Sequence, residues 1–222
     1  MVEFTSKITH IVDYPVSEGS PTRIFTCSIP SSVSIPYVSG QFAMIAHPDV
    51  KLLANPNALK WASYSISSSP TLQGSLEFCI GDGSPTGVSH RLMALNVGDE
   101  ILVKGAFGHF KLREDAPEYV FLATGTGIAP LISMVRTLLK NGSTVPITLY
   151  FGFRYPSQFM YAHELAHLQS AHSNFKCVVT ASRPDANWSH SKGYVQDVLK
   201  HHSFHHLNQK KNNTRQPTKK IS

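Results

Sequence analysis

Glycine, threonine and proline residues gather between residues 123 and 130, directly after a short apolar run. The segment reads Ala123-Thr124-Gly125-Thr126-Gly127-Ile128-Ala129-Pro130. Glycines at such a turn let backbone N–H groups approach a phosphate, and the N-terminus of a following helix favours the same negative charge. The spacing departs from the three-glycine dinucleotide fingerprint, because Pro130 stands at the third position. By itself the segment predicts either a phosphate site or a plain strand–helix turn.

Two further segments carry side chains that suit a bound cofactor. The first is Tyr64-Ser65-Ile66-Ser67-Ser68, where an aromatic ring can stack on a flat heterocycle while hydroxyls donate to its nitrogen edge. The second is Gly87-Val88-Ser89, whose N–H groups and hydroxyl suit a second phosphate. Taken alone, each also fits an ordinary element, namely a strand with a serine-rich end and a turn.

A competing motif, His163-Glu164-Leu165-Ala166-His167, matches the His-Glu-x-x-His pattern of zinc proteases. On a helix the two histidines share one face and can bind zinc beside a catalytic glutamate. The flanking sequence gives no support, since His172 is not at the spacing of a third ligand. A zinc hydrolase is therefore a remote alternative, and we expect no metal site.

The composition is that of a globular protein and excludes several other classes. Of the 222 residues, 41% are hydrophobic and 15% charged, and no apolar run is long enough to span a membrane. The start of the chain lacks the pattern of a signal peptide, so we expect a cytoplasmic protein. Cys27, Cys79 and Cys177 are too scattered for a zinc ribbon or a cysteine-ligated iron–sulfur cluster.

The net charge of +6 does not indicate a nucleic-acid partner, because the charge is concentrated in one segment. Residues 201–222 contain no acid and hold five basic residues, Lys210, Lys211, Arg215, Lys219 and Lys220. The remainder is close to neutral and predicts no basic binding face. We expect residues 203–222 to form a basic, disordered tail.

The elements that must position these motifs change in kind along the chain. Residues 6–12, 23–29, 41–47, 63–67, 76–80 and 100–104 read as short strands, and residues 48–57 read as a loop. Such spacing predicts an antiparallel barrel or sandwich. Beyond about residue 116, apolar runs at 119–123, 145–153 and 175–181 alternate with helical patterns at 128–140, 158–170 and 195–202. This alternation predicts a parallel sheet with crossover helices.

The order of the motifs resembles that of the ferredoxin–NADP⁺ reductase superfamily. In the first half the matching pieces are Gly40-Gln41-Phe42, Tyr64-Ser65-x-x-Ser68, Gly87-Val88-Ser89-x-x-Leu92, Gly98-Asp99, Gly105 and Gly108. In the second half they are Gly125 to Pro130, Phe151-Gly152-Phe153-Arg154, Glu164-Leu165, Ser182-Arg183-Pro184 and Gly193-Tyr194-Val195. The resemblance implies a two-domain α+β protein. Residues 1–115 would form an antiparallel flavin (FAD) barrel, and residues 116–202 an α/β parallel-sheet NAD(P)-binding domain.

The resemblance also assigns roles to residues. Tyr64 would stack on the flavin and Ser65 would hydrogen-bond near its N5, which makes them the candidate catalytic pair. The expected cofactor-binding residues on the flavin side are Tyr64, Ser65, Ile66, Ser68, Gly87, Val88 and Ser89. On the nucleotide side they are Thr124, Gly125, Thr126, Gly127, Ile128, Ala129, Pro130, Arg154, Ser182, Arg183, Lys192 and Tyr194. Ser182, Arg183, Lys192 and Tyr194 resemble a 2′-phosphate site, which favours NADPH while leaving NADH open.

Two departures from the family pattern affect the expected function. Ala62 stands where relatives carry an arginine that pairs with the flavin pyrophosphate, so the choice between FAD and FMN stays open, and Lys60 is a possible replacement at a different strand position. After Gly193-Tyr194-Val195 we find no further parallel strand with a Cys-Gly-Pro-like end.

We therefore expect an NAD(P)H-dependent flavoprotein oxidoreductase. It would pass electrons through bound FAD to a separate acceptor, such as ferredoxin, free flavin, a quinone or an oxygenase partner. The alternative is a non-catalytic flavin-binding subunit or truncated remnant.

Overall fold

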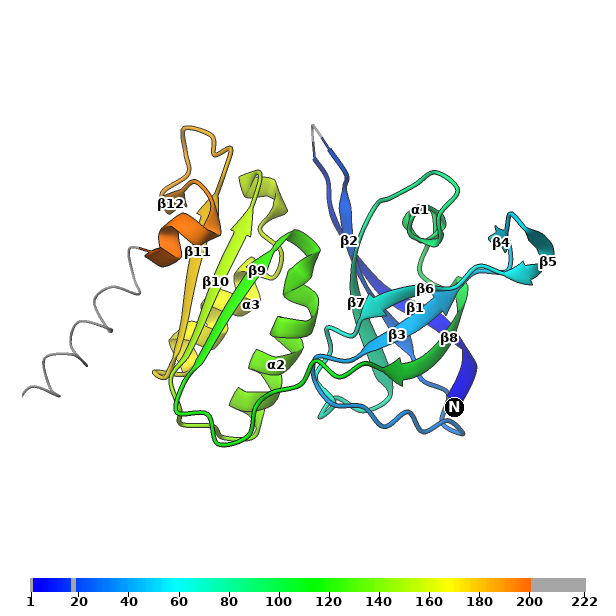
Figure 1. The fold of residues 1–222 in the computed structure, drawn as a ribbon, viewed down its shortest axis with the longest axis horizontal. Coiled ribbons are helices and arrows are strands. Elements are labelled where there is room, and N and C mark those ends of the chain that lie inside the picture. Colours follow the sequence, from blue (N-terminus) through cyan, green and yellow to red (C-terminus); the bar gives the residue numbers. More distant parts are fainter. Residues whose placement is uncertain (1, 17–18, 201–222) are drawn as a thin grey trace, which may run out of the picture.

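The computed structural model describes residues 2–16 and 19–200, which form two domains side by side (Figure 1). The first is a six-stranded antiparallel sheet in the order β6-β3-β8-β1-β2-β7. Its strands are β1 (Val2–Tyr14), β2 (Thr22–Ser28), β3 (Phe42–Ala46), β6 (Ala62–Ser65), β7 (Ser75–Gly81) and β8 (Glu100–Phe107). A bridge between Ile66 and Phe78 brings the end of β6 against β7, so the sheet nearly closes into a barrel. The antiparallel barrel predicted from the sequence is confirmed.

Alternating burial along the strands explains how this sheet closes around a core. In β1, Phe4, Ser6 and Ile8 are buried while their neighbours are exposed, as expected for a strand with one face inward. Phe25 and Phe78 face each other from adjacent strands with 5.6 Å between ring centroids.

Two segments of the barrel differ from the sequence-based expectation. Residues 48–57, expected to be a loop, contain β4 (Lys51–Leu52) and most of β5 (Asn55–Leu59), a hairpin that projects away from the nucleotide domain in Figure 1. Most of its side chains are exposed, so no alternation of apolar residues marks these strands. The segment expected to be a turn at residue 87 opens helix α1 (Val88–Met93), which is too short for a periodic pattern.

The second domain is a parallel sheet in the order β12-β11-β10-β9, as the alternation of patterns predicted. Its strands are β9 (Tyr119–Thr124), β10 (Ile147–Phe153), β11 (Phe175–Ala181) and the short β12 (Ser191–Lys192). Its helices are α2 (Ile128–Lys140), α3 (Ala162–Ala171) and the 3₁₀ turns η1 (Gly125–Gly127) and η2 (Pro156–Gln158). Residues 195–200 are also helical.

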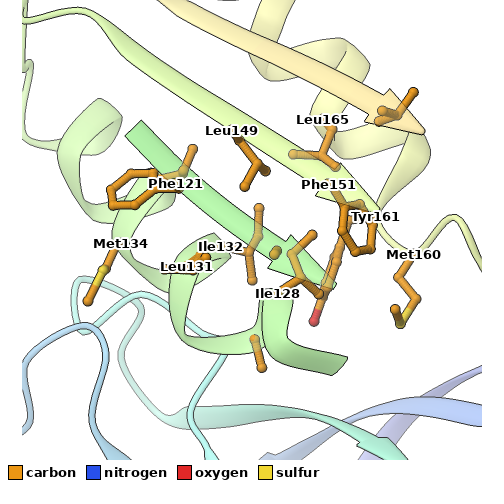
Figure 2. Close-up of a cluster of buried hydrophobic side chains, with 14 of the residues drawn as sticks. Phe121, Ile128, Leu131, Ile132, Met134, Leu149, Phe151, Met160, Tyr161 and Leu165 are labelled. Atoms are coloured by element: carbon orange, nitrogen blue, oxygen red, sulfur yellow. The ribbon is translucent and has the colours of Figure 1, made fainter. Parts of the chain in front are cut away.

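Helix α2 forms where the sequence places an apolar stripe that ends at Asn141-Gly142. Its buried residues, among them Ile128, Ile132 and Val135, pack onto the sheet. Figure 2 shows this core, with Phe121, Leu149 and Phe151 of the sheet facing α2 and Leu165 of α3 beside them.

A polar strip on α2 joins the two domains. Figure 1 shows α2 on the side of its sheet that faces the barrel. Ser133 donates to the backbone carbonyl of Ser68 (2.6 Å), and the Thr137 hydroxyl lies 2.9 Å from that of Ser69. Arg136 lies between them and reaches Ser67 and Glu77 of the barrel. Spacings of three and four residues place these side chains on one helix face.

The remaining expectations concern element ends and the terminal segment. Helix α3 begins at Ala162 rather than near residue 158, because η2 precedes it and Tyr161 adopts a left-handed backbone with φ of +61°. β12 was not expected. The predicted disordered tail at residues 203–222 lies outside the described residues. Within the described ranges, no helix combines the length and apolar character needed to cross a membrane.

Candidate flavin and nicotinamide-nucleotide site

Tyr64 lies on β6, at the rim of the barrel that faces α1. Strand pairing places it opposite Ala43 of β3, with its ring half-buried. Burial raises the pKa of its hydroxyl to about 12, and a hydrogen bond with the Ser89 side chain offsets part of that rise. The phenol is therefore neutral at physiological pH and available as a hydrogen-bonding and stacking surface.

The residues that follow Tyr64 divide between the rim and the interior. Ser65 is half-buried opposite Phe42. The Ile66 side chain is fully buried in the barrel core, and its amide donates to the Gln41 carbonyl. Ser68 is 1% exposed, and its hydroxyl lies 3.0 Å from that of Tyr37 and accepts from the Glu77 amide. Ser68 thus belongs to the contact between the domains and is separated from Tyr64 and Ser65.

The loop before α1 contains Gly83 and Gly87, which let its backbone pass close to Ser89 and Ser84. A Cβ on Gly83 would lie 2.7 Å from the Ser89 hydroxyl, and one on Gly87 would lie 2.9 Å from the Ser84 carbonyl. Val88 is buried and anchors the helix, and the neighbouring Ser89 is half-buried. Both glycines thus allow a close turn of the backbone before α1, and turns of this kind can hold a phosphate.

The glycine-rich segment after β9 is open to a cleft, as a phosphate site requires. Gly125 has φ of +51°, and a Cβ placed on Gly125 or Gly127 would meet no atom within 4 Å. Ile128 and Ala129 point into the core, and Pro130 lines a separate groove beside β9. Of the segment predicted to bind pyrophosphate, the structure therefore gathers Thr124, Gly125 and Thr126 at the cleft.

Both domains line this cleft, which has a volume of about 600 Å³. From the nucleotide domain come Thr124 to Thr126, Gly152, Arg154, Ser182, Tyr194 and others, and from the barrel come Gly19, Ser20 and Thr22. A Cβ on Gly81 at the end of β7 would lie 3.5 Å from the Thr126 methyl carbon, so barrel and turn are in contact. A nucleotide in this cleft would meet the barrel directly.

The expected 2′-phosphate residues lie at the ends of β11 and β12. Ser182 and the 62% exposed Tyr194 line the cleft. Arg183 donates from Nη1 to the Tyr155 hydroxyl (3.2 Å), and Lys192 on β12 is exposed. These four residues lie near one another through the pairing of Ala181 with Lys192.

The zinc-protease-like motif has a different use in this structure. Both Glu164 oxygens accept from Arg136, at 2.6 Å from Nε and 2.6 Å from Nη2. His163 and His167 are exposed on α3. Across residues 2–16 and 19–200 no group of three or more His, Cys, Asp or Glu side chains is arranged to hold a metal ion. Glu164 is engaged in an ion pair and is not free to act as a general base.

Sequence reasoning did not identify two contributions to the site. The β1–β2 hairpin supplies Ser20 and Thr22 to the nucleotide cleft, and Arg136 of the nucleotide domain pairs with Glu77 of the barrel. Neither has a local signal, since both depend on which segments meet in three dimensions.

Comparison with known protein families agrees with this geometry. Residues 12–112 match the model of the oxidoreductase FAD-binding domain, and residues 121–215 match that of the oxidoreductase NAD-binding domain. The two matches together cover most of the chain. They define the chain as a flavin- and nicotinamide-nucleotide-binding protein of the oxidoreductase class.

Solved structures agree in fold. The chain superposes on ferredoxin–NADP⁺ reductase from Plasmodium falciparum with 2′P-AMP (TM-score 0.74, 26% identity, 93% of this chain and 82% of that one). It also superposes on the Neisseria gonorrhoeae enzyme with bound FAD and NADP (TM-score 0.73, 23% identity, 92% and 78%). The chain belongs to the ferredoxin–NADP⁺ reductase-like superfamily.

Two curated relatives are longer proteins than this chain. The chain is 28% identical over 174 residues to the reductase component DmpP of phenol 2-monooxygenase from Pseudomonas sp. (strain CF600), covering 76% of this chain and 46% of that protein. It is 31% identical over 121 residues to one component of the Na⁺-translocating NADH-quinone reductase from Haemophilus ducreyi, covering 53% and 30%. The chain thus spans less than half the length of either relative.

Proposed function

We propose that this protein is an NAD(P)H-dependent flavoprotein reductase that passes electrons from a nicotinamide nucleotide, through FAD, to a separate acceptor. The observation that carries the proposal is the contact of Thr126 with Gly81, in a cleft lined by both domains. A nucleotide held by the Thr124–Thr126 backbone would extend towards the barrel rim, where Tyr64 and Ser65 lie.

The residues would divide the work between flavin and nucleotide. The flavin, when bound, supplies the chemistry by accepting a hydride and releasing electrons one or two at a time. Tyr64 would cover its ring, Ser65 would hydrogen-bond near N5, and Val88 and Ser89 amides would hold its phosphate. Because the Tyr64 hydroxyl is neutral, it orients the flavin without adding a charge beside it.

The donor nucleotide would lie in the shared cleft. The backbone of Thr124, Gly125 and Thr126 would hold its pyrophosphate, and Arg154 and Tyr194 also line the cleft. Ser182, Arg183 and Lys192 bring a hydroxyl and two cations to the same end of the sheet, which suits a 2′-phosphate and favours NADPH over NADH. We include Ser68 and Pro130 only as supports of the two domains, given where their side chains lie.

The acceptor is a separate partner in this proposal. The relatives named above are a monooxygenase reductase component and a component of a quinone reductase, so an oxygenase component and a quinone are the leading candidates. A cytoplasmic location stays a prediction from the sequence.

The direct test is to purify the protein, record the visible absorbance of oxidised flavin, and add NADPH or NADH without oxygen. Flavin that is retained and bleached by either nucleotide supports the proposal. Absence of flavin contradicts it. Bound flavin that neither nucleotide bleaches would favour the non-catalytic flavin-binding subunit, for which the observation is that β9 lies at the sheet edge with no second partner strand among the described residues.

A further inference from the structure

One face of strands β2 and β7 is packed against the nucleotide domain. Ile24 of β2 and Cys79 of β7 stand opposite each other and belong to the buried cluster that forms the core of that domain. Thr22 and Gly81, two residues farther along the same strands, also stand opposite each other. Because side chains two residues apart in a strand point to the same side, the Thr22 side chain is directed at the nucleotide domain.

Gly81 gives a second measure of this direction. A Cβ built on Gly81 would lie 3.5 Å from the Thr126 methyl carbon, in the turn η1 that precedes α2. The Cβ atoms of directly opposed residues in an antiparallel pair are about 4.5–5.5 Å apart. Thr22 and Thr126 therefore lie near each other, one from each domain, and both line the nucleotide cleft.

The Thr22 hydroxyl is a polar group that the protein itself does not satisfy. Thr22 is 5% exposed, yet its hydroxyl forms no hydrogen bond with any other group of the described residues. In residues 2–16 and 19–200, every fully buried side-chain nitrogen or oxygen has a hydrogen-bond partner. The small exposure that Thr22 retains must therefore include its hydroxyl, and the cavity that Thr22 lines is the nucleotide cleft. A nearly buried, unpaired hydroxyl favours a ligand that completes its hydrogen bonding.

Thr22 lies at a defined end of this cleft. A Cβ on Gly19, at the other end of the segment, would lie 3.5 Å from Nη1 of Arg154. Arg154 in turn accepts from the Arg183 amide through its carbonyl (2.8 Å). The segment from Gly19 to Thr22 thus runs from the expected 2′-phosphate residues towards Thr126, and its hydroxyl-bearing end lies beside the turn expected to hold pyrophosphate.

We propose that Thr22 is a nucleotide-binding residue supplied by the flavin domain, and that its hydroxyl donates a hydrogen bond to the pyrophosphate of the donor. This rests on the proposed binding of a nicotinamide nucleotide in the cleft. It implies that the nucleotide is held from both domains, so that the barrel contributes to nucleotide affinity as well as to flavin affinity. Because NADPH and NADH share the pyrophosphate, Thr22 strengthens both equally and sets no preference between them.

The test measures dissociation constants of the full chain by titration calorimetry with NADP⁺, NAD⁺ and 2′-AMP, of which 2′-AMP lacks the pyrophosphate. Thr22→Val keeps the shape of the side chain and removes the hydroxyl. It should weaken NADP⁺ and NAD⁺ by the same factor, about tenfold, and leave 2′-AMP unchanged. Thr22→Ser keeps the hydroxyl and should retain most of the affinity. Thr26→Val, on the same strand but outside the cleft, is the matched control and should bind as wild type.

The outcomes separate this inference from the proposed function. If wild-type protein binds neither NADP⁺ nor NAD⁺, nucleotide binding itself fails. If wild type binds NADP⁺ and Thr22→Val binds it as tightly, only the role of Thr22 is refuted. An equal loss of affinity for 2′-AMP would also refute it, since it would show a damaged cleft rather than a lost pyrophosphate contact. A loss of the same size in Thr22→Ser would refute the role of the hydroxyl.

Discussion

Arg136 of α2 and Glu77 of β7 form an ion pair, 2.8 Å between Nη1 and Oε1, across the boundary between the nucleotide domain and the barrel. The same guanidinium binds both oxygens of Glu164 on α3. Burial alone would lower the pKa of Arg136, but its hydrogen bonds to Glu164 and the charge of Glu77 outweigh burial and raise it. One permanently charged side chain on α2 thus joins β7 of the barrel to α3 of the nucleotide domain.

Arg136→Met is expected to lower the free energy of unfolding by about 3–5 kcal/mol, because it leaves two partly buried carboxylates without their cation. Glu77 is 18% exposed and Glu164 32% exposed. Denaturant unfolding measures the change, with Arg113→Met as a control at an exposed arginine. A loss below about 1 kcal/mol would show that this ion-pair network does not hold the domains together.

The two interpretations of the His-Glu-x-x-His motif predict opposite results. If Glu164 serves the ion pair, Glu164→Gln should destabilise the protein by about 1–3 kcal/mol, since a charged hydrogen bond is lost. His163→Ala, at an exposed position, should stay within about 0.5 kcal/mol of wild type. Protein purified without added zinc should contain none in stoichiometric amount. One zinc per chain that is lost in His163→Ala would instead support a metal site.

Gly40 of the barrel lies against Phe110 and against Met134 of α2, where a side chain has no room. Its φ is +97°, and a Cβ there would lie 2.2 Å from the Phe110 carbonyl oxygen and 2.4 Å from Met134 Cε. Gly40→Ala should therefore cost about 1–3 kcal/mol more than Gly74→Ala, since Gly74 has a similar φ of +79° but no atom within 4 Å. Melting temperatures of the two variants measure the difference. Equal losses would mean that the close approach is relieved without cost.

The buried cysteines should be unreactive in the native protein. Burial raises the pKa of Cys27 to about 11 and that of Cys79 to about 12. Because the folded-state pKa values exceed that of an unfolded thiol, these groups contribute stability below about pH 9 that is lost as the pH rises towards 11 and 12. A thiol reagent at pH 8 should modify these two residues slowly in folded protein and rapidly in denaturant. Fast native modification of either cysteine would contradict the burial.

Arg183 should set the preference between nucleotides. Arg183→Gln is expected to raise the KM for NADPH about tenfold or more, and that for NADH much less, because only NADPH carries the 2′-phosphate. Lys176→Gln, an exposed lysine on the same strand β11, is the control. Equal effects on both nucleotides would place Arg183 outside the 2′-phosphate site.

The sequence alone predicted long elements with clear periodicity better than short or exposed ones. Helix α2 and strand β11 begin and end where expected, because an apolar stripe and a buried run mark them and Asn141-Gly142 ends the helix. The β4–β5 hairpin and α1 were missed, since neither is long enough or buried enough to leave a pattern.

The candidate functional site was likewise only partly predictable from the sequence. The motifs at Tyr64 and Gly125 can be found from local spacing together with family resemblance. The position of Ser68 in the contact between the domains and the hairpin beside the cleft both depend on tertiary packing, which no local window contains.

The central claim is that a nucleotide in the shared cleft reduces flavin held by the barrel. It is tested most directly by mixing FAD-loaded protein with NADPH, and separately with NADH, in an anaerobic stopped-flow instrument, using nucleotide with hydrogen or deuterium at the transferable C4 position. We predict loss of the oxidised-flavin absorbance with at least one nucleotide, at a rate that is slower with deuterium. Flavin absorbance that stays unchanged with both nucleotides would contradict the account.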